Sequence, residues 1–102
     1  MDPRTTYDRR REVQILDVRW PDEWAAGHIS GSVHIPMEQI PERLAELDRD
    51  RPVVTVCRSG HRSDQVAEYL RQHDLPAENM PGGLEQWAIE GLPLTRPHFD
   101  PR

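Results

Sequence analysis

Short apolar runs alternate with amphipathic stretches along the chain. Residues 13–18 (VQILDV) and 53–56 (VVTV) are apolar and β-branched, which is typical of strands buried in a sheet. Residues 32–35 (SVHI) predict another short strand, and a weaker one is expected near residues 78–80. Helices are expected between these strands, over residues 21–26, 40–47, 63–73 and 84–89. This alternation predicts an α/β domain with a largely parallel sheet.

Two of these helices carry clear end signals. The first has an acidic opening turn, in which Glu23 suits the positive end of a helix, and Gly27 is expected to end it. The helix over residues 63–73 has an apolar stripe, and Ser63 or Asp64 is expected to cap it.

The composition describes a small acidic domain. The 102 residues include 18 acidic and 13 basic side chains, for a net charge of −5, and every basic residue is an arginine. The lack of lysine excludes Schiff-base chemistry and a phosphate-loop lysine, and the single Cys57 excludes an internal disulfide and a paired-cysteine zinc site. We expect one domain over residues 1–102, with its core at about residues 13–94 and peripheral termini at 1–12 and 95–102.

Bulk properties limit the classes of partner. The first residues are charged, and no apolar run approaches the roughly 20 residues of a membrane helix. A net acidic domain also lacks the basic surface that nucleic-acid binding needs. The sequence therefore predicts a soluble, cytoplasmic protein with no membrane or nucleic-acid partner. No sustained heptad is visible, so a monomer is expected.

The segment with the clearest chemistry is residues 57–63 (CRSGHRS), which lie between the strongest strand and the best helix. This order places the segment at the carboxyl end of a strand, where open α/β folds bind ligands. Gly60 permits the left-handed backbone of a tight cradle of N–H groups. Those groups, with Arg58 and Arg62, are expected to lower the pKa of the Cys57 thiol. The loop thus predicts a reactive thiolate.

Other residues have plainer interpretations. A lone cysteine is often a small buried hydrophobe, but the basic residues around Cys57 favour the reactive thiolate. Asp17 and Arg19 end the first strand and can face the same crevice, where the Asp17 carboxylate is expected to hold the loop by hydrogen bonds. His61 either tunes the local field or is simply exposed. His28 is expected to be structural, because no other His or Cys lies at metal-ligand spacing, and no metal site is predicted.

Three segments resemble the signatures of the rhodanese-like sulfurtransferases. They are the loop CRSGHRS, residues 15–36 (ILDVRWPDEWAAGHISGSVHIP) and residues 81–94 (PGGLEQWAIEGLPL). The likeness covers about residues 13–94. It implies a rhodanese-like fold, with a central parallel sheet of about five strands flanked by helices, and neither a metal nor an organic cofactor.

The resemblance also implies a reaction. Cys57 would take a sulfane sulfur from a donor such as thiosulfate, become a persulfide, and pass the sulfur to cyanide or a thiol. A thiolate of moderately lowered pKa suits this exchange, and arginines can orient an anionic donor. Other expected partners are a protein persulfide or a thioredoxin-like thiol. Asp17 and Arg19 would support the loop, and the persulfide would be held by the residues that follow Cys57, namely Arg58, Ser59, Gly60, His61, Arg62 and Ser63.

Two other functions remain open. The chain could be a rhodanese-like module that binds a partner, or that receives sulfur only from a dedicated protein. It could also be a phosphatase or arsenate reductase of the same fold. Such enzymes have a Cys-x5-Arg loop, whereas only four residues separate Cys57 from Arg62. The shorter loop favours a sulfur atom over a phosphate at its centre.

Overall fold

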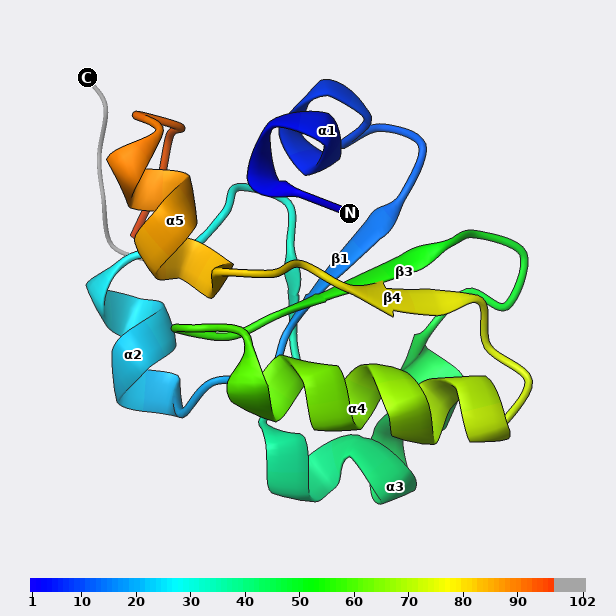
Figure 1. The fold of residues 1–102 in the computed structure, drawn as a ribbon. Coiled ribbons are helices and arrows are strands. Elements are labelled where there is room, and N and C mark those ends of the chain that lie inside the picture. Colours follow the sequence, from blue (N-terminus) through cyan, green and yellow to red (C-terminus); the bar gives the residue numbers. More distant parts are fainter. Residues whose placement is uncertain (97–102) are drawn as a thin grey trace.

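The structure is a computed structural model, and it describes residues 1–96. Figure 1 shows a twisted central sheet with helices on both sides. The strands are β1 (Gln14–Asp17), β2 (Val33–His34), β3 (Val53–Val56) and β4 (Ala77–Asn79). The helices are α1 (Pro3–Asp8), α2 (Pro21–Ala26), α3 (Ile40–Arg43), α4 (His61–Gln72) and α5 (Gly83–Ile89), with the 3-10 turns η1 (Met37–Gln39) and η2 (Leu44–Glu46) on either side of α3.

The four strands form one parallel sheet in the order β2-β1-β3-β4. This confirms the α/β class and corrects the expected number of strands from about five to four within residues 1–96. The only other pairing in that range is an isolated antiparallel bridge between His28 and Thr95, which is too short to add a strand. Asp17 lies opposite Val56, so β1 and β3 end at the same edge. Cys57 follows at that edge.

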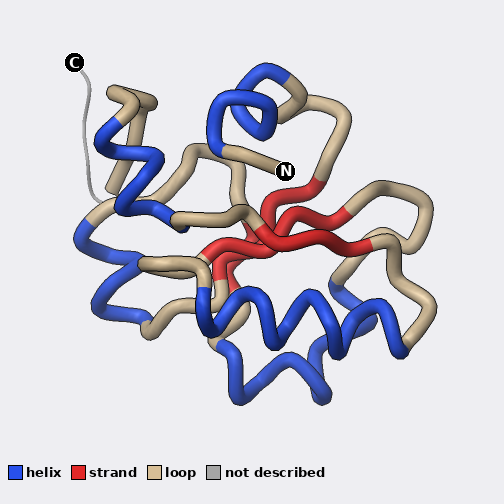
Figure 2. Tube along the Cα trace, viewed as in Figure 1, coloured by secondary structure: helices blue, strands red, loops and turns tan. Residues whose placement is uncertain are grey.

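The core is divided by the sheet into two clusters. On the face covered by α3 and α4, Leu16 and Val53 are buried in one cluster. On the face covered by α1 and α5, Ile15 and Val54 pack in a second cluster with Trp87. Figure 2 shows the helices on either side of the strands. Successive side chains of a strand point to opposite faces, so β1 and β3 need apolar residues at consecutive positions. This explains the adjacent apolar residues Ile15 and Leu16 in β1, and Val53 and Val54 in β3.

Two helix predictions need correction. Helix α4 begins at His61, before the predicted start, because Gly60 takes the cap position in a left-handed conformation (φ 101°). Neither Ser63 nor Asp64 is the cap. The helix predicted over residues 40–47 is divided into α3 and η2, because Arg43 leaves helical dihedral angles at the junction (φ −117°, ψ 16°).

The N-terminal segment docks on the body of the domain. Helix α1 packs on α5, where the rings of Tyr7 and Trp87 meet edge to face with centroids 5.9 Å apart. The amino group of Met1 donates to the Asn79 carbonyl (3.0 Å). Of the terminus expected to be peripheral at residues 95–102, the part from residue 97 lies outside the described residues. Within residues 1–96, no helix is long and apolar enough to span a bilayer.

Candidate active site

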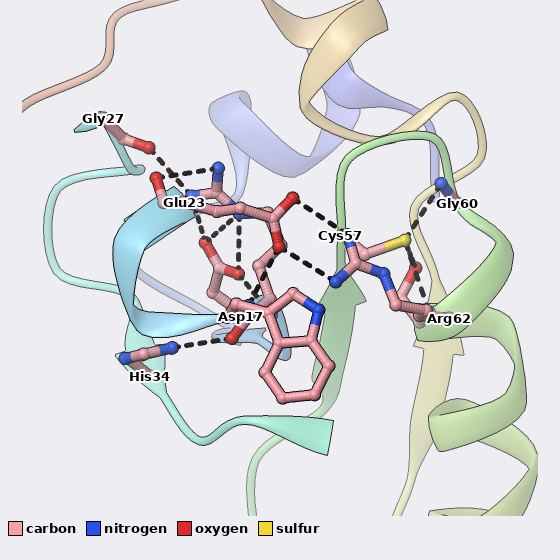
Figure 3. A network of polar contacts seen from close by, with 10 residues as sticks. Asp17, Glu23, Gly27, His34, Cys57, Gly60 and Arg62 are labelled. Atoms are coloured by element: carbon pink, nitrogen blue, oxygen red, sulfur yellow. Dashed lines mark hydrogen bonds and ion pairs between the residues drawn. The ribbon is translucent and has the colours of Figure 1, made fainter. Parts of the chain in front are cut away.

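Cys57 begins the loop after β3, and its side chain is fully buried. Its Sγ atom accepts hydrogen bonds from the N–H groups of Gly60 (3.1 Å) and Ser63 (3.4 Å), and the Ser63 hydroxyl lies 3.2 Å away (Figure 3). We call these three donors the sulfur cradle. The structure thus brings Cys57, Gly60 and Ser63 of the predicted site around one sulfur atom.

Asn79, at the end of β4, holds both arms of the cradle. Its Nδ2 group donates to the Gly60 carbonyl (3.1 Å), and its Oδ1 atom lies 2.5 Å from the Ser63 hydroxyl. The hydroxyl has one proton, so it donates to Asn79 or to the sulfur, but not to both at once. Asn79 therefore competes with the Cys57 sulfur for the proton of the Ser63 hydroxyl.

Helix α5 supports the loop from the other side. The N–H groups of Leu84 and Glu85 donate to the carbonyls of Cys57 (2.9 Å) and Arg58 (3.0 Å). At Gly83, which has a φ of 59°, an added Cβ atom would lie 2.5 Å from both of these carbonyl oxygens. Only glycine allows so close an approach.

The pKa of Cys57 is set by opposing effects. Burial raises the pKa of the thiol, but hydrogen bonds from the Ser63 hydroxyl and from the N–H groups of Ser63, Gly60 and Ser59 outweigh it. The net result is a pKa below the ordinary value. Hydrogen bonds to the charged form favour ionisation, so the cradle suits a thiolate.

Within residues 1–96, the hydrogen bonds to the Cys57 sulfur come from the cradle, and both loop arginines are paired with carboxylates. Both terminal nitrogens of Arg62 bind the Glu23 carboxylate (2.9 and 3.0 Å), and Nε of Arg58 pairs with Glu85 (3.2 Å). Glu23 and Glu85 lie in the first turns of α2 and α5, which both face the loop. Each guanidinium is therefore matched by a carboxylate.

Asp17 and Arg19 form a buried ion pair one step away from the loop. Oδ2 of Asp17 accepts from Nη2 of Arg19 (2.7 Å), which also donates to the Gly27 carbonyl (2.8 Å). The hydrogen bonds found for the Asp17 carboxylate go to Arg19, so the expectation that it binds the loop directly is wrong. The pair instead fixes α2, the helix that carries Glu23 (Figure 3).

The remaining predicted residues lie around the loop. Ser59 and His61 are exposed and line an open cavity of about 480 Å³ beside Asn79. His28 has a structural position, since its ring stacks on Trp24 at 3.5 Å and its Nδ1 atom hydrogen-bonds to the Trp24 carbonyl. Across residues 1–96, no group of three or more His, Cys, Asp or Glu side chains is arranged to hold a metal ion.

This geometry can be compared with known families. The sequence model of the rhodanese-like domain matches residues 4–90, which includes the loop and all four strands. The chain belongs to the rhodanese-like domain family.

Related rhodanese-like proteins match most of the chain. A protein named sulfurtransferase from Allochromatium vinosum is 42% identical over 87 residues, which is 84% of this chain and 81% of the relative. The thiosulfate sulfurtransferase GlpE of Pseudomonas aeruginosa is 38% identical over 80 residues, which is 78% of this chain and 73% of that protein. These names support sulfurtransferase activity for this rhodanese-like chain.

A solved structure supports the fold. The rhodanese-related protein from Thermoplasma volcanium superposes with a TM-score of 0.90 at 32% identity, and the match covers 93% of this chain and 95% of that one. The four-stranded parallel sheet and its flanking helices are thus those of a rhodanese-like domain.

Three residues around the rhodanese-like loop were missed by the sequence analysis. Asn79 lies in the strand predicted near residues 78–80, and the rule that parallel strands end at one edge could have placed it near Cys57. Glu23 and Glu85 are acidic residues in helix first turns, where the helix dipole alone explains them. No sequence signal pointed to their arginine partners.

Proposed function

We propose that this chain is a sulfurtransferase in which Cys57 carries sulfane sulfur as a persulfide. The observation that carries the proposal is the sulfur cradle, in which two backbone N–H groups and one hydroxyl surround a buried Sγ atom. Fixed donors of this kind stabilise negative charge on sulfur without a metal or a base. They suit a thiolate and the anionic persulfide formed from it.

The first half-reaction loads the sulfur. The Cys57 thiolate attacks the sulfane sulfur of a donor such as thiosulfate. An S–S bond forms at Sγ while the S–SO₃ bond breaks, and the bonding pair leaves with sulfite. No proton moves and the charge balances, so the site needs no separate acid or base.

The second half-reaction unloads it. Cyanide or an acceptor thiolate attacks the outer sulfur of the persulfide, and Cys57 leaves as a thiolate. A low thiol pKa speeds this step, because leaving ability improves as the pKa falls. The acceptor can be a small thiol or a thioredoxin-like thiol, and a protein persulfide can take the place of thiosulfate as the donor. Because Cys57 must stay reduced between turnovers, we place the protein in the cytoplasm.

The direct test is the intact mass of the protein after incubation with thiosulfate, an organic thiosulfonate or an organic persulfide. We expect the mass of one added sulfur atom, removed again by cyanide and absent from Cys57→Ser. The proposal fails if none of the three donors adds sulfur, or if Cys57→Ser still gains it.

A second candidate is a relay module that receives sulfur only from a dedicated protein. The pairing of both loop arginines favours this alternative, because it leaves little free positive charge to attract a small anion. It predicts that a protein persulfide loads Cys57 while all three small donors fail. A pure binding module would instead hold its partner equally well with Cys57→Ser.

A further inference from the structure

Glu23 joins helix α2 to the active-site loop. Its two carboxylate oxygens accept from the two terminal nitrogens of Arg62, and one of them also accepts the Trp20 N–H (2.9 Å). The side chains of Glu23 and Arg62 are 24% and 31% exposed, so the pair is better protected from solvent than Arg58 and Glu85, at 71% and 53%. Water and salt therefore screen the Glu23–Arg62 ion pair less than the Arg58–Glu85 pair.

Arg62 is close enough to the thiol for its charge to matter. The hydrogen bonds to Glu23 are the largest cause of the raised pKa of Arg62, and the negative charge of a thiolate at Cys57 raises it further. Figure 3 shows the guanidinium held between the labelled Glu23 and Cys57 side chains. Arginine binds a small oxyanion through the same two parallel N–H···O bonds that Arg62 makes to Glu23. In this chain Glu23 already occupies both donors.

Arg62 also borders an apolar pocket of about 380 Å³. The pocket includes Trp20, a large apolar side chain with 53% of its surface exposed. The chain as a whole is polar, with a mean hydropathy of −0.82. The other lining residues are Val18, Met37, Glu38 and Pro41. Such a pocket can take the carbon skeleton of an organic sulfur donor, which thiosulfate lacks.

We propose that Glu23 is a specificity-determining residue that neutralises Arg62 and so turns the site away from dianionic thiosulfate. The favoured donors are singly charged organic compounds, namely thiosulfonates and persulfides, whose carbon bodies enter the pocket at Trp20. This inference rests on the proposed function and specifies its donor. The sulfur step stays balanced, since a thiosulfonate anion gives the Cys57 persulfide and a sulfinate.

The first test measures the field at Cys57 without any sulfur transfer. Glu23→Gln removes the charge and keeps an oxygen for the Trp20 N–H. Cys57 is alkylated with anionic iodoacetate and with neutral iodoacetamide, and the ratio of the two rates is taken, because the thiolate fraction cancels in it. We expect the ratio to rise about threefold to tenfold in Glu23→Gln. Glu85→Gln, the matched control, should change it by less than about twofold, because its pair is exposed.

Two further variants remove the charge of Arg62, first alone and then together with the charge of Glu23. Arg62→Gln leaves Glu23 uncompensated and should lower the ratio, whereas the double variant Glu23→Gln/Arg62→Gln should return it close to wild type. If Glu23→Gln is too unstable to measure, the expected fall of the alkylation ratio in Arg62→Gln still tests the proposal. The proposal is overturned if folded Glu23→Gln and Arg62→Gln both keep the wild-type ratio.

The second test compares donors of different charge. Glu23→Gln should lower the KM for thiosulfate by more than the KM for methanethiosulfonate, with kcat changed little. Trp20→Ala should raise the KM for benzenethiosulfonate and leave that for thiosulfate unchanged. If sulfur transfer occurs but these KM values do not separate, the donor inference fails and the proposed function stands. If no donor loads the wild type, the proposed function fails and the alkylation ratio alone decides the role of Glu23.

Discussion

The inner and outer sides of the loop at residues 57–63 handle charge in different ways. On the inner side, the N–H groups of Gly60 and Ser63 point at the sulfur of Cys57, and the Ser63 hydroxyl lies 3.2 Å from it, with Asn79 as the competing acceptor of its proton. On the outer side, each guanidinium meets a carboxylate. Backbone and hydroxyl dipoles therefore stabilise the thiolate, while the ion pairs limit the positive charge that an approaching donor meets.

The two sides also differ in how they are held. The inner side is fixed by secondary structure, through Asn79 at the end of β4 and the amides that open α5. The outer side is fixed by side-chain ion pairs that salt and substitution can alter. Changes to the inner framework should therefore have larger effects than changes to the outer charges.

The largest expected effect comes from Gly83→Ala. The added Cβ would meet the Cys57 and Arg58 carbonyls at 2.5 Å in a left-handed backbone, so the loop must shift. We expect a loss of about 3 kcal/mol in the free energy of unfolding, measured by denaturant titration, and the loss of most sulfur transfer.

Gly91→Ala is the matched control for Gly83→Ala. Gly91 has a similar φ of 73° but no atom within 4 Å of the added Cβ. It should cost only about 1 kcal/mol, from backbone strain alone. Equal costs for the two variants would mean that the contact of α5 with the loop does not matter.

A smaller effect is expected from Ser63→Ala. Loss of the hydroxyl removes the foremost hydrogen bond that lowers the pKa of Cys57, while burial continues to raise it. The pKa of the thiol should rise, and the rate of alkylation below that pKa should fall severalfold. The pH profile of iodoacetamide alkylation measures both.

Ser59→Ala is the control that tests whether the Ser63 hydroxyl causes the change in the pKa of Cys57. Ser59 contributes through its backbone N–H, and its side chain is exposed. Its pH profile should therefore overlay that of the wild type. A shift as large as that of Ser63→Ala would show that loop conformation, and not the Ser63 hydroxyl, controls the thiol.

The smallest effect should come from Arg58→Gln. Arg58 is 71% exposed and paired with Glu85, so its charge at the sulfur is screened. We expect the KM for anionic donors to rise by less than about twofold. A large rise would restore Arg58 to the donor-binding role that the sequence suggested.

The sequence was informative where structure is local. The strand over Val53–Val56, the following glycine loop and the amphipathic helix each have their own pattern, so the position of Cys57 at a strand end could be predicted. Parallel strands ending at one edge also bring Asp17 near the loop. The number of strands was harder to predict, because the only further pairing within residues 1–96 is a single bridge between His28 and Thr95.

The charge pattern around the loop could not be predicted in the same way. Glu23 and Arg62 are 39 residues apart, and they meet only because α2 packs beside the start of α4. Their pairing depends on side-chain rotamers as well as on topology. Thus the residues that touch the sulfur were largely predictable, whereas the partners of the arginines were not.

We infer that the sulfur cradle, and not the arginines, lowers the pKa of the Cys57 thiol. Since Cys57 is the only cysteine, its ionisation can be followed directly by the ultraviolet absorbance of the thiolate as pH is raised. We expect a pKa of Cys57 below the ordinary value in the wild type, and one that stays below it in the double variant Glu23→Gln/Arg62→Gln, which removes the Arg62 charge together with its partner. A return of the pKa to the ordinary value in that variant would contradict the account.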